Sequence, residues 1–231
     1  MFSKLLLTSV VALASVTSLA ARDGVVTSSD GRMTFVPRRT QSVTQSAASD
    51  AGLVTIFDNI GKVYPKGAYS CCDGFTVTGP DAPSGPEFWV GAAFTPSANH
   101  TVTVIKVALG LIGGSNEVVL SVNNDNGGVP GTAIKSWNVK SLPEAGTCCT
   151  VMARKDEAGI PITAGTQYWI VVQTSNSSNI QAAWDVNDTD QVDSSTIAFY
   201  CSSPSGVCQN NNQWTVEQRV PGPAFAVLGS E

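Results

Sequence analysis

Histidine and charged side chains are scarce in this chain, which limits the kinds of catalysis it could perform. The 231 residues include one histidine, and Asp, Glu, Lys and Arg together make up 13%. A Ser-His-Asp triad would have to use His100, yet no G-x-S-x-G motif marks a nucleophilic serine. The simpler interpretation of His100 is an exposed turn residue at the start of a strand. We therefore expect no catalytic residues and a protein that is not an enzyme.

Basic residues are also few, and this bears on the choice of partner. The 13 Lys and Arg residues are outnumbered by 18 Asp and Glu residues, and the formal net charge is -5. Binding to phosphate groups needs clustered basic residues. Nucleic acid and anionic membranes are therefore not expected as partners.

The first 20 residues have the pattern of a signal peptide. Lys4 precedes an apolar stretch over residues 5–16, and Ser18-Leu19-Ala20 provides the small residues typical of a cleavage site. A buried helix or an N-terminal anchor is the alternative, but the stretch is shorter than the roughly 20 residues that a spanning helix needs. We expect a secreted, extracellular protein with no membrane span in the mature chain and no anchor at the C-terminus.

Residues 21–52 are rich in Ser, Thr and Gln and predict a flexible leader. Within this segment, residues 33–37 have the pattern of a short strand. Cleavage of a pro-segment near Arg38-Arg39 is an alternative to a plain linker.

The six cysteines favour disulfide bonds over a metal site, because the chain is expected to be exported. Cys201 and Cys208 flank a loop of Ser, Pro and Gly, so we predict that they form a loop-closing disulfide. The doublets Cys71-Cys72 and Cys148-Cys149 leave three alternatives: vicinal disulfides, cross-links between the doublets, or a four-thiolate zinc site. Zinc is the weakest of these, because adjacent cysteines lack the C-x-x-C spacing of such sites.

Strand patterns and turn residues dominate residues 53–231. Residues 117–139 predict a central hairpin. Val118, Leu120 and Val122 alternate with other residues in its first strand, NNDNGGVPG supplies a turn with Gly127 and Gly128, and residues 134–139 form the return strand. Further strands are predicted at 88–94, 101–111, 148–154, 167–174, 180–186, 197–200, 217–220 and 224–228. There is no amphipathic helix and no repeat, so we predict one all-β domain, an antiparallel β-sandwich or jelly roll.

Four motifs resemble the bacterial choice-of-anchor β-sandwich domains. They are Phe94-Thr95, the alternating strand 102–111, the turn 125–131 and the late strand 165–169, within a similarity that covers roughly residues 55–185. The resemblance implies an exported β-sandwich, and it supplies no catalytic residue. Such domains typically end in a surface-sorting tail, which this sequence lacks, so secretion is the expectation.

The five tryptophans are candidates for a sugar-stacking platform, and they are Trp89, Trp137, Trp169, Trp184 and Trp214. Trp169 shares one strand face with Gln167 and Gln173, and a planar indole with flanking amides suits sugar stacking and hydroxyl bonding. Trp137 is a second candidate for such a platform. The competing interpretation is that a loop or second sheet covers Trp169 and makes it part of the core.

Oxygen-rich side chains gather in two turns, at residues 123–126 and at Asp185, Asn187, Asp188 and Asp190. Calcium takes six to eight oxygen ligands, so the second group is the better calcium candidate. Capping of their own backbone is the alternative role of such side chains. No other cofactor is expected.

Paired carboxylates would be needed for a glycoside hydrolase. The available acids are Glu87, Glu117, Glu144, Asp156 and Glu157, and no sequence feature pairs them, so this activity is a remote alternative. The sequence as a whole predicts a structural or interaction role in the cell envelope or extracellular matrix, with an extracellular protein or glycan as partner. A carbohydrate-binding module is the main alternative.

Overall fold

The structure of the protein is a computed structural model. It describes residues 25–27, 32–35, 50, 52–60, 73–83, 85–146, 152–187, 195–204, 207–208, 210–218 and 221–231. In these ranges every regular element is a β-strand. No helix that could cross a membrane occurs in the described part of the chain.

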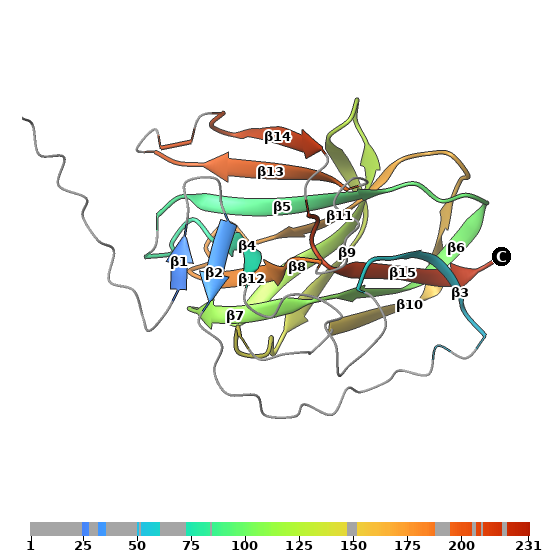
Figure 1. Cartoon of the computed structure of the whole chain (residues 1–231), viewed down its shortest axis with the longest axis horizontal. Coiled ribbons are helices and arrows are strands. Elements are labelled where there is room, and N and C mark those ends of the chain that lie inside the picture. Colours follow the sequence, from blue (N-terminus) through green and yellow to red (C-terminus); the bar gives the residue numbers. More distant parts are fainter. Residues whose placement is uncertain are drawn as a thin grey trace, which may run out of the picture.

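Two antiparallel sheets form a sandwich, which confirms the predicted fold class (Figure 1). The smaller sheet has four strands in the order β10 (Met152–Ile162), β6 (His100–Val107), β15 (Phe225–Ser230) and β3 (Val54–Asp58). The main path of the larger, 11-stranded sheet is β1 (Val25–Thr27), β2 (Arg32–Phe35), β4 (Asp73–Thr78), β5 (Glu87–Phe94), β11 (Tyr168–Gln173), β8 (Glu117–Asp125) and β9 (Pro130–Lys140).

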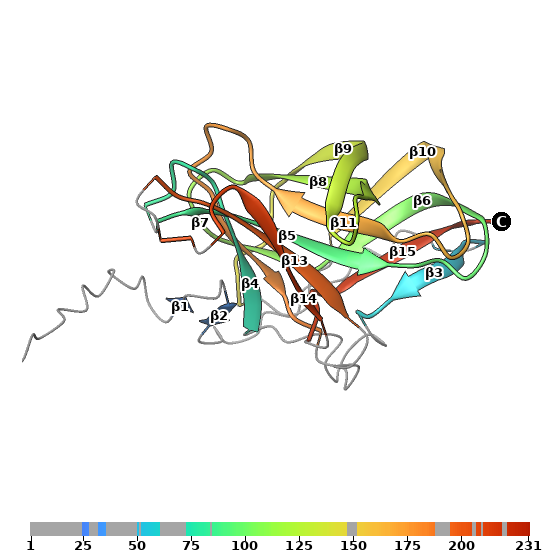
Figure 2. The ribbon, with the colours of Figure 1, turned by 90° about the horizontal axis from the view of Figure 1, so that it is seen from above.

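Four further strands extend the larger sheet. β12 (Gln181–Asp185) pairs with both β4 and β7 (Leu109–Gly113), while β13 (Thr196–Ser202) joins β5 to β14 (Gln213–Gln218). This sheet is curled, and Figure 2 shows β8 and β9 on one side of β5 and β11, with β13 and β14 on the other.

The main core lies between the two sheets, because alternate residues of each strand point to the same side. The smaller sheet contributes Val102, Ile105, Val107, Phe225 and Val227, and the larger sheet contributes Phe75, Val90, Leu120, Ile170 and Trp184. All are buried, and each such side chain contributes about 1.5–3 kcal/mol relative to an exposed position.

The central hairpin forms as predicted, with longer strands. β8 and β9 pair from Glu117↔Lys140 to Asp125↔Pro130, and residues 126–129 make the turn. Gly127 and Gly128 have φ values of 68° and 91°. This left-handed conformation is accessible to glycine at little cost, which explains the double glycine.

The predicted single strand 101–111 is wrong. It is two strands in different sheets, because β6 belongs to the smaller sheet and β7 to the larger one. Between them Ala108 is fully buried and donates its N–H to the Ala224 carbonyl at 3.1 Å. The hydrophobic alternation continues through this break, so Ile105, Val107 and Leu109 still face the core as expected.

Other element boundaries differ from expectation as well. β10 runs through Ile162, beyond the predicted end at residue 154, and β14 lies at 213–218 where a strand was predicted at 217–220. In the segment predicted as a leader, β2 pairs with β4, with Arg32 opposite Phe75. The predicted Cys201–Cys208 disulfide is confirmed. The doublets Cys71-Cys72 and Cys148-Cys149 lie outside the described residues.

Candidate functional site

The candidate site lies on the outer face of the larger sheet, which points away from the core. Neighbouring strands here are β9, β8, β11, β5, β13 and β14, all antiparallel. Residues aligned by register form rows that cross these strands. One row holds Asn123, Trp169 and Ala93; the next holds Ser121, Val171, Gly91, Ala198 and Val216; a third contains Tyr200 between Trp89 and Trp214.

Asp125 fastens the tip of the β8–β9 hairpin onto this face. Its Oδ1 accepts hydrogen bonds from Trp169 Nε1 at 2.8 Å and from Gln167 Nε2 at 2.8 Å. Its Oδ2 accepts the Gly128 N–H at 3.0 Å. The hairpin tip is therefore joined to β11 by one carboxylate.

The same carboxylate is held in its charged form. Burial pushes the pKa of Asp125 upward, but hydrogen bonds from Trp169, Gly128 and Gln167 outweigh that effect and hold the pKa below its ordinary value. Asp125 therefore serves as an internal acceptor, which agrees with backbone and side-chain capping as the role of the 123–126 cluster.

Trp169 offers no surface for sugar stacking, which corrects its candidacy as a platform. Its side chain is fully buried, and Val171 and Ala198 are buried beside it. Pro130 packs over the same face: a Cβ at Gly91 would lie 2.9 Å from Pro130 Cγ. The physical reason is that the hairpin tip folds back onto β5 and β11 and covers the indole.

The other predicted sugar-binding residues are also distributed differently from the expected platform. Gln167 has its amide bonded to Asp125, and Gln173 is half-buried at the end of β11. Trp137 is half-buried and packs against the main core, on the opposite side of the sheet from Trp169. These four residues therefore do not combine into one exposed surface.

A different group of aromatic residues is partly exposed on the outer face. Trp89, Tyr200 and Trp214, here called the aromatic cluster, come from β5, β13 and β14 and are all half-buried. Tyr200 pairs in register with both Trp89 and Trp214. The rings of Trp89 and Tyr200 stack with centroids 4.2 Å apart and an interplanar angle of 17°, and Trp214 is tilted 5.7 Å from Tyr200.

Glu87 and Thr174 fix the position of Trp89. The Trp89 indole N–H donates to Glu87 Oε1 at 3.1 Å and lies 3.3 Å from Thr174 Oγ1, and the Thr174 hydroxyl lies 3.3 Å from the same carboxylate oxygen. Burial raises the pKa of Glu87, although the hydrogen bonds from Thr174 and Trp89 oppose the rise. By contrast, the indole N–H of Trp214 donates no hydrogen bond to any described residue.

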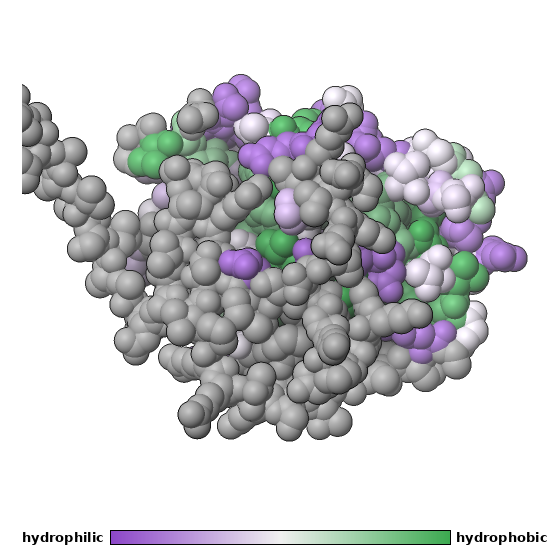
Figure 3. Space-filling model, viewed as in Figure 1, coloured by the Kyte–Doolittle hydropathy of each residue, from purple (hydrophilic) through white to green (hydrophobic). Residues whose placement is uncertain are grey.

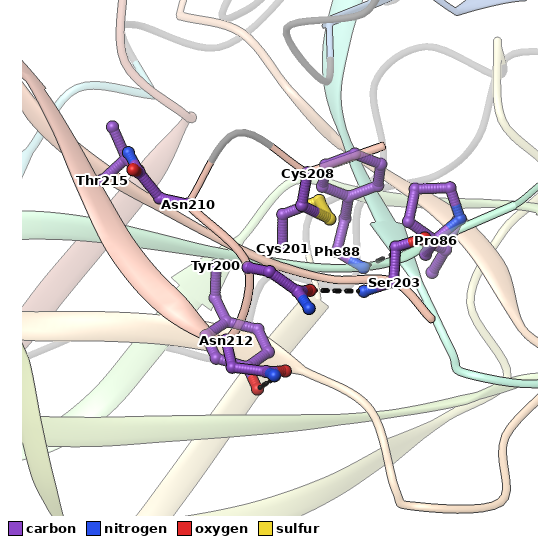
Figure 4. Close-up of a disulfide and its surroundings, with 11 residues drawn as sticks. Pro86, Phe88, Tyr200, Cys201, Ser203, Cys208, Asn210, Asn212 and Thr215 are labelled. Atoms are coloured by element: carbon purple, nitrogen blue, oxygen red, sulfur yellow. Dashed lines mark hydrogen bonds between the residues drawn. A yellow bond between two sulfur atoms is a disulfide. The ribbon is translucent and has the colours of Figure 1, made fainter. Parts of the chain in front are cut away.

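A disulfide-closed loop lies next to the aromatic cluster (Figure 4). Cys201 and Cys208 are seven positions apart, and the Cys201 carbonyl accepts the Asn212 N–H at 2.8 Å. Asn212 has a φ of 62°, and its Oδ1 lies 3.4 Å from the Tyr200 hydroxyl. Figure 4 shows Tyr200 and Asn212 on one side of the strand, with the disulfide and Phe88 on the other.

Uncharged polar residues follow one another on the loop beside the aromatic cluster, and Asn212 is the one whose side chain lies near Tyr200. Asn210, Asn211, Asn212 and Gln213 are all exposed. In Figure 3, hydrophilic and hydrophobic residues adjoin along the upper edge of the molecule, where β13 and β14 lie in Figure 1. The arrangement combines aromatic rings with amides that both donate and accept hydrogen bonds.

The proposed calcium ligands are only partly described. Asp185 and Asn187 are buried, whereas Asp188 and Asp190 lie outside the described residues. Asp185 Oδ1 has no hydrogen-bond partner in the part of the chain that the structure describes, and burial raises the pKa of this carboxyl well above its ordinary value. Within the described ranges, no three His, Cys, Asp or Glu side chains gather as a metal-binding group.

Within the described structure, His100, Glu117 and Asp156, which were considered for catalysis, do not have the neighbours that a triad or a carboxylate pair requires. Among the described residues Nδ1 of His100 has no hydrogen-bond partner, so no described carboxylate forms the contact of a triad at that atom. Glu117 is 3.3 Å from Lys140 Nζ, and Asp156 is 3.1 Å from Lys135 Nζ. Each of these two carboxylates therefore has a lysine partner.

Sequence reasoning named Trp89 and Trp214 among the candidate tryptophans but did not predict that they would lie together with Tyr200. Trp89 is more than a hundred residues away from Tyr200 and Trp214 along the chain, and strand order and register bring the three rings together. The alternation in FWVGAAF does separate Trp89 from the core residues of β5. Nothing in the sequence shows that β13 would pair with β5.

Comparison of the chain with protein-family models, with curated proteins and with solved structures found no match.

Proposed function

We propose that this protein is exported and acts outside the cell as a non-enzymatic β-sandwich that binds another extracellular molecule through the aromatic cluster. The observation that carries the proposal is the group of three partly exposed rings from β5, β13 and β14 beside exposed amide side chains. Aromatic surface that stays partly hydrated and is surrounded by polar residues is typical of an interaction site.

Export is supported by the signal-peptide pattern of residues 1–20 and by the Cys201–Cys208 disulfide. Disulfides persist mainly in oxidising compartments outside the cytosol. The resemblance of the hairpin turn and the late strand to choice-of-anchor domains agrees with an exported interaction role.

A retention assay tests this function. The secreted chain is applied to a panel of insoluble polysaccharides, immobilised matrix proteins and lipid vesicles. We expect retention by at least one member of the panel, loss of retention in Trp214→Ala, and normal retention in Ile134→Ala. Ile134 is a suitable control because it is 46% exposed and lies on β9, at the other end of the strand order from β14. Retention by no member, or equal loss in both variants, would overturn the proposal.

A further inference from the structure

We propose that the ligand of the aromatic cluster is a neutral polysaccharide; this inference rests on the proposed function. An acidic polysaccharide or a protein segment could contact the same aromatic rings, so these are the two alternative ligands. The choice between them follows from charge, from hydrogen-bonding groups and from the freedom of each ring.

Charge at the site disfavours an anionic ligand. The three strands that carry the cluster, β5, β13 and β14, contain no lysine or arginine, and their charged residues are Glu87 and Glu217. Glu87 lies beside Trp89 on the face of the cluster, so an acidic chain would meet its carboxylate, and like charges repel. Recognition of sulfate or uronate groups normally uses Arg or Lys, which the three strands lack.

The hydrogen-bonding groups match hydroxyls. The exposed amides of Asn212 and Gln213 each have an N–H donor pair and a carbonyl acceptor, whereas the Asn210 amide donates to Thr215 Oγ1 at 3.0 Å. A sugar hydroxyl likewise donates and accepts, so these side chains can pair with it in either direction. The Tyr200 hydroxyl adds another group of the same kind, because its contact with Asn212 is long at 3.4 Å.

The rings differ in how much freedom they have. Trp89 stacks on Tyr200 and its indole N–H donates to Glu87, so one ring face and the N–H already have partners within the protein. Trp214 lies on β14, whose one partner among the described strands is β13, and its ring is tilted 51° from Trp89 and 57° from Tyr200. We therefore assign the stacking role to Trp214 and the hydroxyl-bonding role to Tyr200 and Asn212.

The Cys201–Cys208 disulfide restrains the loop beside the aromatic cluster before any ligand binds. It closes the loop that precedes β14, and the Cys201 carbonyl and the Asn211 side chain bond backbone N–H groups inside that loop. These contacts hold the described part of the loop in place before binding, so that part loses less conformational entropy on binding, which favours affinity.

Isothermal titration of the secreted chain tests the inference. The probes are soluble β-glucan, mannan and arabinoxylan as neutral chains, and alginate and polygalacturonate as acidic chains. We expect one or more neutral chains to bind equally at low and high salt, and the acidic chains not to bind. Salt independence is expected because no ion pair would contribute.

Variants identify the residues involved. Trp214→Ala should weaken binding about tenfold or more, because aromatic contacts dominate binding energy, and Tyr200→Phe should weaken it less. Ile134→Ala is the control, and circular dichroism and thermal unfolding show whether each variant is folded. Since Trp214 also packs near Val171, Tyr200→Phe keeps the test informative if Trp214→Ala unfolds.

The two proposals fail in different ways. Binding by acidic chains alone, or Trp214-dependent retention on a matrix protein with no polysaccharide bound, would overturn the neutral-glycan inference and leave the interaction function standing. Absence of binding to every probe and every panel member would overturn both. Neutral-chain binding that is unchanged in folded Trp214→Ala and Tyr200→Phe proteins would also overturn the inference.

Discussion

Replacing Asp125 with alanine should destabilise the protein by removing the contact between the β8–β9 hairpin and Trp169. Three donors would lose their acceptor: the Trp169 indole, the Gln167 amide and the Gly128 N–H. Water can reach the last two, but the Trp169 side chain is fully buried. A buried donor left unpaired costs about 1–3 kcal/mol, and hydrogen bonds to a charged acceptor contribute about 1.5–3 kcal/mol, so we expect a loss of about 2–4 kcal/mol.

Urea unfolding followed by tryptophan fluorescence measures this loss. Asp125→Asn is the matched control, because it keeps one acceptor oxygen and should lose less. Trp169→Phe removes the donor, so in the Asp125→Ala background it should cost about 1–2 kcal/mol less than in the wild type. An Asp125→Ala protein within about 0.5 kcal/mol of the wild type, a change typical of neutral surface substitutions, would refute the reasoning.

The same contact predicts an acid dependence. The pKa of Asp125 is lowered in the folded state, so its contribution is fully present above the ordinary aspartate pKa of about 3.9 and is lost as the pH falls through the folded value. The stability difference between wild type and Asp125→Ala should therefore shrink below about pH 4. A difference that stays constant from pH 7 to pH 2 would contradict the role of the charged carboxylate.

Three further predictions concern other parts of the structure. The Cys201→Ser/Cys208→Ser protein should lose about 2.5 kcal/mol in urea unfolding, because the disulfide closes a short loop in the unfolded chain; an unchanged midpoint would contradict this. Gly91→Ala should cost about 1–3 kcal/mol through overpacking against Pro130, and Pro130→Ala in the same protein should restore part of the loss. Wild-type stability should fall as the pH rises above about 4, because the raised pKa of Asp185 favours the protonated carboxyl in the folded state. Asp185→Asn should flatten this dependence; added Ca²⁺ that stabilises only the wild type would show instead that the carboxylate binds a cation.

The sequence predicted elements well where local chemistry decides them. The hairpin at 117–139 was predicted because alternating apolar residues indicate a strand with one buried face, and because a turn with positive φ favours glycine, here Gly127 and Gly128. The Cys201–Cys208 bond was predicted because the two cysteines flank a short loop. Residues 101–111 were wrongly predicted as a single strand, because hydrophobic alternation is the same on both sides of Ala108 although the pairing partners change.

Candidate sites were predicted less well, because exposure depends on residues distant in sequence. Trp169 and Gln173 lie on one side of β11 as the alternation indicates, and Gln167, just before this strand, bonds the same carboxylate as Trp169. The sequence does not show that Asp125 and Pro130 cover the indole. That covering depends on how far the β8–β9 hairpin bends back over β5.

By itself, the sequence determined the all-β class, the turn at Gly127-Gly128 and which side of each strand is apolar, because these depend on side-chain period and backbone sterics. Only the tertiary structure decided which apolar surface remains partly open. Strand order and register bring Trp89, Tyr200 and Trp214 together from three strands, while the hairpin buries Trp169. The physical reason is that sheet pairing is a long-range choice, made by packing between segments far apart in the chain.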